Sequence, residues 1–463
     1  MWTCARVLRR YKLMRTIENL RPYQQRSVDY LKGNPMAMLD MGMGMGKTII
    51  ALTSIQSRIA VGWGPAVIFG PKRVVEGVWT EEAKKWEHTK DLMFSKVLGT
   101  PKQKLKGLTA KADIYLCNYE SMKWLVENWP EKFFDQVIYD EVTNMSSMTS
   151  VRMRAWKKVL PGIMFRTGMT GTPTRGTMKG LQGQYYAIDE GERLGRLKTV
   201  YDATYMTSHH VVWKRVFKPG AKQAIMDKIR DITLTMETAD YRTLPDVIHN
   251  DVMVTLPKDL KAQYDKLEKH RVLRIGDDLN VFAGSDAVRD LRCAQMASGF
   301  IVTEDDTIHY VHNLKLDALH EIVKTEGPLL VLYDFVPNRE RILQAFQAYN
   351  PVDLSDPRIN ITKFITDWNR GKVHMAVGHP QAIGFGLDGL QKNPKAHMVF
   401  YGLTDNGEAY MQTLARLVRP PRVAPVRIHR ILARDTIDEK KMKRVDRKMG
   451  VEMQFKSAMK NPG

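Results

Sequence analysis

The chain has 463 residues, of which 43% are hydrophobic and 26% are charged, a composition typical of a globular protein that is too long for one hydrophobic core. Lysine and arginine outnumber aspartate and glutamate by 71 to 51, which gives a formal net charge of +20. A surplus of this size indicates a polyanionic partner, most simply nucleic acid, unless the charge forms a basic surface that only meets solvent.

The cysteines and the apolar runs argue against several classes of protein. Cys4, Cys117 and Cys293 are too far apart in sequence for a zinc motif or a disulfide framework, so we expect a reducing, intracellular setting. The longest apolar runs, such as the one from Leu329 to Tyr333, have the length of strands, so no membrane segment is expected. Residues 1–19 are basic and lack the apolar core of a secretory signal. We expect a basic N-terminal arm there, with an organellar transit peptide as the alternative.

A phosphate-binding loop is predicted after a first helix, which ends near Gly33, and an apolar strand from Met36 to Asp40. There the sequence MGMGMGKT precedes a second helical pattern. Glycines allow backbone N–H groups to close on phosphate oxygens, a lysine reaches the β and γ phosphates, and a hydroxyl holds Mg²⁺. Met41 stands where the strict pattern has glycine, so a glycine-rich surface turn is the alternative. The residues expected to bind nucleotide are Gly44, Met45, Gly46, Lys47 and Thr48, the last of which would also hold the metal.

The next two strands are expected to end in polar residues. The strand from Ala66 to Gly70 runs into Pro71, Lys72 and Arg73, and a later strand extends from Asp113 to Asn118. Open α/β sheets bind ligands at the carboxyl ends of their strands. These polar residues are therefore placed where a ligand could reach them.

A further strand ends in two carboxylates, Asp140 and Glu141. Asp140 can hold Mg²⁺ through water, and Glu141 can orient and deprotonate the water that attacks the γ phosphate. Acidic residues that merely follow a strand are the alternative, but the phosphate loop upstream favours catalysis. A strand over residues 163–166 then leads into Thr170, Gly171 and Thr172, a polar turn that can link the nucleotide site to a neighbouring surface.

Residues from about 176 to 245 are less regular, and we expect an insertion with helical elements. Its adjacent histidines, His209 and His210, lack partners at metal-ligand spacing, so no metal site is predicted. A helix from Thr255 to Val272 leads to a second alternation of strands and helices, with strands at 329–335, 373–379, 397–402 and 426–432. Because this region has no phosphate loop, we expect two α/β lobes with nucleotide in the cleft between them.

The second lobe contains a helical pattern from Glu408 to Arg419, in which Gln412, Arg416 and Arg419 share one face. Such residues more often form a solvent-exposed row on the surface of a helix. An ATPase with a cleft between lobes, however, needs arginines near the γ phosphate. Upstream, glycines in the sequence AIGFGLDGL allow the backbone to approach a ribose or a phosphodiester, and Gly386 is the candidate contact.

Taken in order, these motifs resemble those of the helicase superfamily two ATPases, and within them the Swi/Snf-type DNA translocases. The segments that carry the resemblance are LRPYQ, DMGMGMGKT, VIFGPKRVVEGVWTEEAKKW, DIYLCNYESM, VIYDEVTNMSS, TGMTGTPTRG, LPDVIHNDVMVTLPKDLKAQYDKL, HNLKLDALHEIV, AIGFGLDGL, QTLARLVRP and DTIDEKK. The set spans residues 20 to about 441, and the small size is similar to that of phage-encoded members. Thr143 departs from the usual histidine of the family and Asp388 from its usual asparagine.

The resemblance implies an α/β protein of two tandem RecA-like lobes, over residues 20–245 and 246–440, followed by a basic tail over 441–463, and it implies ATP and Mg²⁺ as cofactors. Gln24 would read the adenine, and Asp388 would join the nucleotide site. The catalytic residues would be Lys47, Asp140, Glu141, Arg416 and Arg419. The DNA contacts would be Pro71, Lys72, Arg73, Asn118 and Tyr119, and the coupling residues would be Thr170, Gly171, Thr172 and Gln412.

We therefore expect a monomeric, ATP-dependent translocase that moves on single-stranded DNA or on one strand of a duplex without sequence specificity. A strand-separating DNA helicase, an RNA-dependent ATPase and a non-enzymatic DNA-binding module are the alternatives. Protein partners in replication, recombination or repair would fit this activity, and a membrane would not. If the chain is phage-encoded, its location would be the cytoplasm of the bacterial host.

The net charge leads to a first testable expectation. If the +20 charge is the footprint of nucleic acid, the logarithm of the DNA affinity should fall linearly with the logarithm of salt concentration, because each neutralised phosphate releases counterions. Fluorescence anisotropy with a labelled oligonucleotide over a salt series measures the slope, which is about −0.9 per neutralised phosphate for duplex DNA. A flat response would show that the charge has another purpose.

Overall fold

The computed structural model describes residues 14–128, 134–209, 214–275, 279–282, 284–384 and 387–460. The chain folds into two compact units, one made of Met1–Tyr241 with Val451–Gly463 and the other of Arg242–Gly450. The division after Tyr241 lies near the lobe boundary that the sequence suggested. The region from 441, expected as a basic tail, is instead helical to Met459, and from Val451 onward it belongs to the first unit.

The first unit contains a seven-stranded sheet in which all neighbouring strands are parallel. Its strands, in spatial order, are β3 (Phe94–Val97), β4 (Ile114–Asn118), β2 (Ala66–Gly70), β5 (Gln136–Asp140), β6 (Phe165–Thr170), β1 (Met36–Met41) and β9 (Thr233–Met236). In this register Asp40 lies beside Thr170, and Asp140 lies beside Met169. The sheet therefore brings the phosphate loop, the acidic pair and the polar turn to one edge.

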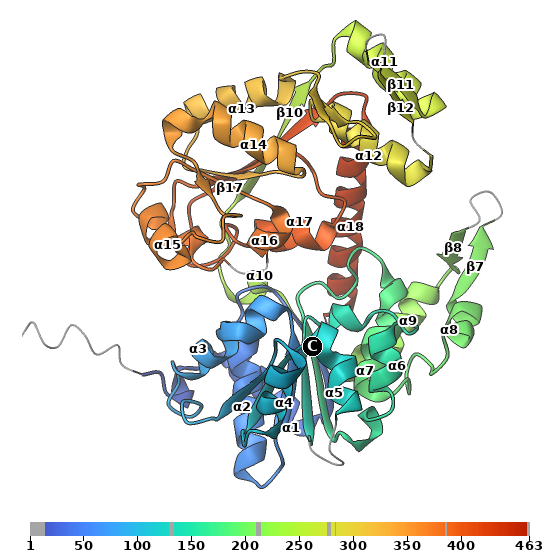
Figure 1. Cartoon of the computed structure of the whole chain (residues 1–463). Coiled ribbons are helices and arrows are strands. Elements are labelled where there is room, and N and C mark those ends of the chain that lie inside the picture. The colour runs from blue at the N-terminus through green and yellow to red at the C-terminus, as the bar shows by residue number, and fades with distance from the viewer. Residues whose placement is uncertain are drawn as a thin grey trace, which may run out of the picture. The chain divides into compact units, whose positions relative to one another are not determined.

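Helices cover both faces of this sheet (Figure 1). One face packs against α1 (Pro22–Gly33), α2 (Lys47–Ala60) and α3 (Trp79–Ala83). The other packs against α5 (Met122–Glu127), α6 (Val151–Trp156), α7 (Leu181–Asp189) and α9 (Ala221–Ile229). Because β2 is covered on both sides, all five of its residues are buried, as expected for a continuous apolar run in a parallel sheet.

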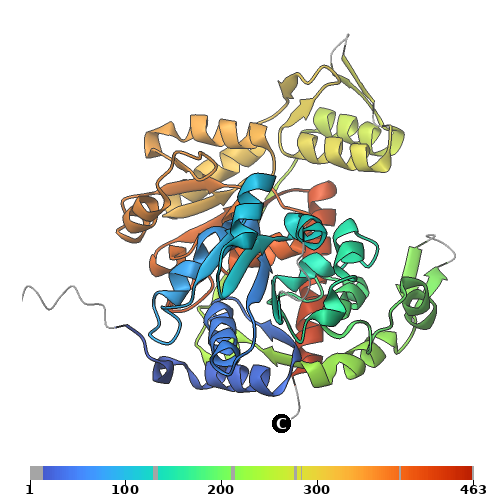
Figure 2. The ribbon, with the colours of Figure 1, turned by 60° about the horizontal axis from the view of Figure 1, so that its bottom comes forward.

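The insertion predicted from about 176 contains helices α7, α8 (Lys198–Tyr205) and α9 as expected, but it is not only helical. An antiparallel ribbon of β7 (Met206–His209) and β8 (Lys214–Phe217) extends away from the sheet (Figures 1 and 2). Strand β9 then returns and becomes the sheet edge beside β1, ahead of the short helix α10 (Thr238–Tyr241). His210 lies outside the described residues.

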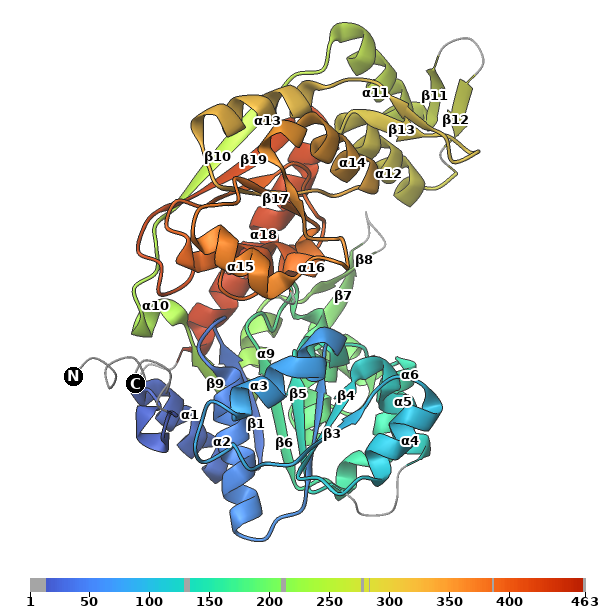
Figure 3. The same ribbon diagram turned by 60° about the vertical axis from the view of Figure 1, so that its left-hand side comes forward.

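The second unit contains a six-stranded, fully parallel sheet. Its order is β10 (Val247–Val254), β19 (Val426–Ala433), β18 (His397–Phe400), β15 (Leu329–Leu332), β17 (Met375–Gly378) and β16 (Val352–Asp353). On one face lie α13 (Leu314–Thr325) and α14 (Val336–Ala345), and on the other α15 (Ile361–Asn369), α16 (Pro380–Gly384), α17 (Gly407–Leu414) and part of α18 (Ile437–Met459) (Figure 3). The predicted α/β class with two parallel sheets is confirmed.

A satellite cluster adjoins this sheet. It is built on α11 (Lys258–His270) and α12 (Asp286–Ala297), near the ribbons β11 (Val272–Ile275) with β12 (Leu279–Phe282) and β13 (Phe300–Val302) with β14 (Ile308–Tyr310). Helix α11 was predicted, whereas edge strand β10, with exposed or half-buried residues throughout, was not. Among the helices of the described residues, none combines the length and apolar character needed to cross a bilayer.

Gly183 tests how closely α7 packs against the acidic motif. A Cβ atom at this position would lie 2.3 Å from the carbonyl oxygen of Met145, in the 3₁₀ helix Val142–Met145 that follows Glu141. We expect Gly183→Ala to destabilise the first unit by about 1–3 kcal/mol, because the backbone must shift. Thermal melting followed by circular dichroism measures this, with Gly33→Ala as the control, since nothing lies within 4 Å of its added Cβ. Equal melting temperatures for the two variants would contradict the expectation.

Candidate functional site

The predicted phosphate loop connects β1 to α2, and its glycines are used for their conformation. Gly44 and Gly46 have φ angles of 75° and 85°, in the left-handed region that favours glycine. A Cβ at Gly46 would also lie 2.2 Å from Nε2 of Gln24. Helix α2 begins at Lys47 directly after the loop, so that its N-terminal N–H groups and dipole favour an anion there.

Gln24 of α1 is a fixed part of the wall of this loop. Its Nε2 donates to the carbonyl oxygen of Met45 at 3.0 Å, and its Oε1 accepts from the backbone N–H of Arg21 at 3.0 Å. The side chain is buried. The structure thus joins Gln24 to the phosphate loop, while adenine recognition by this residue stays a prediction.

The Lys47 ammonium group lies inside the loop. Its Nζ donates to the carbonyl oxygens of Met41 at 2.9 Å and Gly42 at 3.4 Å. Burial lowers the pKa of Lys47, while the carboxylates of Glu141 and Asp140 oppose that shift. A phosphate group would offer this ammonium stronger acceptors than the two carbonyl oxygens.

Asp140 ends β5, where it is half-buried. Its Oδ2 accepts from Nε1 of Trp79 at 3.1 Å, and the hydroxyl of Tyr119 donates to its carbonyl oxygen at 3.0 Å. Burial raises the pKa of Asp140 to about 7, and the charge of Glu141 adds to the rise, while Lys47 and the Trp79 hydrogen bond oppose it. A divalent cation would favour the ionised form, so the carboxyl group fits the metal role that the sequence suggested.

Glu141 occupies a backbone conformation that residues other than glycine rarely adopt, with φ 60° and ψ 63°. The Tyr119 hydroxyl and the backbone N–H of Asn144 donate to its carbonyl oxygen, at 3.2 and 3.0 Å. These bonds hold the peptide in place and leave the side chain directed to the polar turn. Strained backbone of this kind concentrates at functional sites.

The polar turn after β6 is bonded to the acidic pair. Thr170 Oγ1 donates to Oε2 of Glu141 at 3.0 Å and accepts from the backbone N–H of Thr172 at 3.1 Å. A Cβ at Gly171 would lie 3.1 Å from the carbonyl oxygen of Met41 and 3.7 Å from Nζ of Lys47. The phosphate loop, the acidic pair and the turn therefore form one constellation within the first unit.

The predicted nucleic-acid contacts divide into two groups. Lys72 and Arg73 are exposed beyond β2, Pro71 is half-buried beside them, and Asn118 is half-buried with its Nδ2 donating to Glu120 at 2.8 Å. Tyr119 does not fit the prediction, because its side chain is 2% exposed and its hydroxyl is bonded to the backbone of the acidic pair. We reassign Tyr119 to positioning Asp140 and Glu141.

The arginines of the second unit are placed differently from the predicted helix face. Helix α17 ends at Leu414, and Arg416 and Arg419 lie in the turns that follow. Residues before a proline avoid the helical region, and Pro420 follows directly. Gln412 is on the helix but buried, with its Nε2 donating to Glu408 at 3.3 Å. The three residues therefore do not share one helical face.

Both arginines bond the glycine-containing loop of their own unit. Arg416 donates to the carbonyl oxygens of Gly384 and Leu387, the latter at 3.2 Å. Arg419 donates to Asp388 and to Oε1 of Gln391, the latter at 3.2 Å. Gly386 lies outside the described residues.

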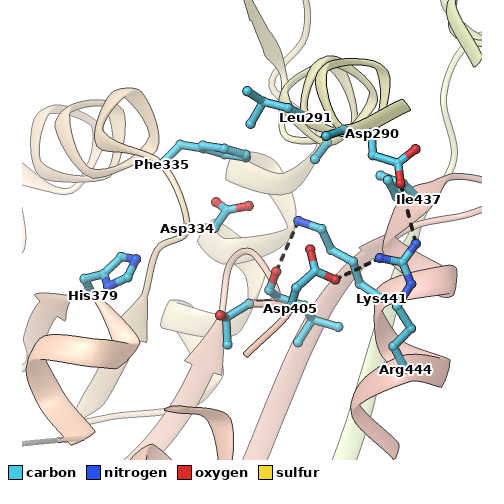
Figure 4. Close-up of a pocket in the computed structure, with 13 residues that line it drawn as sticks. Asp290, Leu291, Asp334, Phe335, His379, Asp405, Ile437, Lys441 and Arg444 are labelled. Atoms are coloured by element: carbon cyan, nitrogen blue, oxygen red, sulfur yellow. Dashed lines mark hydrogen bonds and ion pairs between the residues drawn. The ribbon is translucent and has the colours of Figure 1, made fainter. Parts of the chain in front are cut away.

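A polar pocket at the carboxyl ends of β15, β17 and β18 was not predicted (Figure 4). It has a volume of about 450 Å³ and is lined from those strand ends by Asp334, His379 and Asp405. Arg444 of α18 bonds Asp405 at 3.1 Å and approaches Asp290 of α12 at 3.8 Å. The sequence feature that could have indicated this pocket is the set of polar residues that follow the apolar runs of these strands. Trp79, also missed, is one of the apolar positions of its amphipathic helix.

The chain is similar to known proteins in three comparisons. Residues 17–175 match the family model described as type III restriction enzyme, res subunit. The chain is 31% identical over 472 residues to protein p41 of Acyrthosiphon pisum secondary endosymbiont phage 1, with 95% of this chain and 98% of that protein covered. Among solved structures it is similar to the Sulfolobus solfataricus SWI2/SNF2 ATPase core in complex with dsDNA, with a TM-score of 0.44, 17% identity and coverage of 95% of this chain and 94% of that chain.

The raised pKa of Asp140 predicts a pH-dependent metal affinity. Because its pKa is about 7 in the ligand-free protein, the carboxyl group is mostly protonated below pH 7, and Mg²⁺ must displace that proton. We expect the apparent Mg²⁺ affinity, measured with a fluorescent ATP analogue, to fall by up to about tenfold per pH unit below pH 7 and to level off above it. In Asp140→Asn the affinity should be weaker and this dependence absent. A slope that persists in the variant would belong to the nucleotide and not to Asp140.

Proposed function

We propose that the chain is a helicase superfamily two ATPase that works as an ATP-driven motor on DNA. It belongs to the same family as the phage protein p41, and its residues 17–175 match the model of the type III restriction enzyme res subunit. The ordered motifs favour the Swi/Snf-type branch within that superfamily. The observation that carries the proposal is the constellation of Lys47, Asp140, Glu141 and Thr170 at one edge of a parallel sheet. Such a constellation is suited to phosphoryl transfer to water.

The residues of the first unit divide the chemistry among them. Lys47 and the N-terminus of α2 attract the phosphates, and Thr48 and Asp140 would hold Mg²⁺. The ion would supply charge neutralisation on the phosphate oxygens when bound. Glu141 accepts the proton of the attacking water, and the Thr170 hydroxyl orients the carboxylate through Oε2. Gln24, which is already bonded to the phosphate loop, would place the adenine.

Movement along DNA requires that the state of the bound nucleotide be transmitted from the catalytic residues to the rest of the protein. The bond between Thr170 and Glu141, and the next one to the N–H of Thr172, offer a direct route from the acidic pair into the polar turn. ATP binding would close the two lobes and hydrolysis would reopen them, so that alternating grip advances the protein along one strand.

Arg416 and Arg419 would then leave their present partners to neutralise charge at the γ phosphate. The Asp388 side chain that pairs with Arg419 is 83% exposed, whereas the Arg419 side chain is 10% exposed, so the nucleotide would have to replace the carboxylate as partner of a buried guanidinium. Two carbonyl oxygens hold Arg416. We propose that Gly384, Leu387, Asp388 and Gln391 hold both arginines until nucleotide binds.

DNA would contact Lys72, Arg73 and Asn118 through phosphate groups. Backbone contacts carry no sequence information, so binding without sequence preference follows. ATP turnover measured in parallel with no nucleic acid, single-stranded DNA, duplex DNA and RNA tests the proposal. Stimulation by DNA supports it, stimulation by RNA alone favours the RNA-dependent alternative, and no turnover at all favours a binding module. Displacement of a labelled strand from a duplex would identify a strand-separating helicase.

Glu141→Gln separates binding from hydrolysis. The amide keeps the shape of the side chain but accepts a proton poorly, so we expect ATP affinity to be retained and turnover to fall by about 10²–10⁴-fold. Turnover is followed by phosphate release and affinity by a fluorescent ATP analogue. Glu127→Gln is the matched control, because Glu127 is exposed at the end of α5 and pairs only loosely with Lys123, at 3.4 Å. Turnover near wild type in Glu141→Gln would overturn the catalytic assignment.

A further inference from the structure

The end of α18 is a structural part of the first unit. Phe455 and Met459 are 2% and 1% exposed, in the same buried cluster as Ile225 and Ile229 of α9. The guanidinium of Arg230 donates to the carbonyl oxygen of Ala458 at 3.1 Å. One face of this segment, which lies in the region expected as a basic tail, is therefore packed into the core of the first unit.

Three polar side chains of this segment recur at spacings of four residues: Glu452 and Lys456 on one face of α18, and Lys460 directly after its last residue. Glu452 and Lys456 bond the polar turn, and Lys460 pairs with the start of α10. Lys456 donates to the carbonyl oxygen of Gly171 at 2.6 Å, and its Nζ lies 3.7 Å from Oδ1 of Asp40. It thus bridges the polar turn and the last residues of the strand that leads into the phosphate loop.

Asp40 needs this cation. Its side chain is 0% exposed, burial raises its pKa, and Lys456 opposes that rise more strongly than Lys47 does. The other groups that face it are the hydroxyl of Thr235, which donates to Oδ2 at 3.4 Å, and the more distant charge of Glu237. A buried carboxylate deprived of its cation is strongly unfavourable.

Glu452 holds the other end of the polar turn. Its Oε2 accepts from the backbone N–H of Thr174 at 3.1 Å and from the hydroxyl of the same residue at 2.5 Å. Burial raises the pKa of Glu452 to about 7, while Lys456 opposes that rise. The turn is therefore bonded from the same helix at Gly171 and at Thr174.

Lys460 supports the phosphate loop from a third side. It pairs with Glu237 and with Asp240, the latter at 2.9 Å, and so fixes the start of α10. Thr238 of that helix donates to the carbonyl oxygen of Met43 at 3.4 Å. A Cβ at Gly42 would lie only 2.3 Å from the Thr238 hydroxyl oxygen, so helix and loop are in close contact.

We propose that Lys456 is a positioning residue for ATP hydrolysis, which sets the polar turn against the phosphate loop from the C-terminal end of α18. The inference rests on the proposed function of the site. Gly171 is the residue of the turn that approaches Met41 and Lys47, and its carbonyl oxygen is the acceptor that Lys456 holds. Displacement of Gly171 would also displace the neighbouring Thr170, which orients Glu141.

Lys456→Met tests this role, because it removes the ammonium but keeps the length of a chain that is 11% exposed. We expect kcat for DNA-stimulated ATP hydrolysis to fall about tenfold or more, with KM for ATP changed by less than about threefold, as is typical when a supporting residue is lost. Lys443→Met is the control, since it removes the same charge from an exposed position of the same helix and should leave kcat unchanged.

A second variant separates positioning from stability. In Asp40→Asn/Lys456→Met the Asp40 carboxylate no longer stands without its cation, and Glu452 keeps its bonds to Thr174, so the melting temperature should recover in part relative to Lys456→Met. The bond to Gly171 is still missing, and kcat should therefore stay low. Recovery of kcat together with the melting temperature would overturn the proposal and leave Lys456 as a counter-ion only.

Failure of the inference and failure of the proposed function are distinguishable. Normal turnover by the wild type and by Lys456→Met would overturn the inference alone. Absence of turnover in the wild type, with every nucleic acid supplied, would overturn the function on which it rests.

Discussion

The carboxyl edge of the seven-stranded sheet gathers several charged groups, of which Asp40 and Lys456 are buried and Lys47, Asp140 and Glu141 are half-buried. Asp40, Asp140 and Glu141 supply negative charge there, and Lys47 and Lys456 supply positive charge. Removing any one of these charged groups from water costs free energy, and the neighbouring groups of opposite charge offset that cost. This balance holds the site together, and a nucleotide with its cation would add both negative and positive charge to it.

The parallel arrangement of the strands makes this balance of charges possible. Parallel strands place Asp40 beside Thr170 and Asp140 beside Met169, so the ionisable groups meet without any long loop. Tyr119 and Trp79 then use their polar atoms on the acidic motif, while their rings remain in the core. The same two side chains therefore belong to the aromatic core and to the polar site, so a change in the packing of the core would shift the position of the acidic motif.

Much of the first unit could be predicted because its signals are local. The apolar run from Ala66 to Gly70 is β2 without any shift, and the acidic pair follows its strand directly. Edge strands β9 and β10 escaped prediction, since neither has a long apolar run and strand pairing partners are distant in sequence. Helix α17 ends before its apparent face does, because the chain turns ahead of Pro420. Lys456 could not be assigned from sequence, since a lysine at helical spacing indicates a solvated surface unless its acceptors are known.

The first unit is assembled from two segments that are far apart in the sequence and are therefore synthesised at different times. Lys456 and the carbonyl group that it holds are separated by 285 residues. At a synthesis rate of about 5–20 residues per second, the turn leaves the ribosome on the order of 15–60 s before Lys456 does. During that interval Asp40 lacks the ammonium group of Lys456, so the nucleotide loop is synthesised well before its support from α18. A chain released before residue 456 would contain every residue that touches nucleotide in the first unit and still lack the support that aligns them.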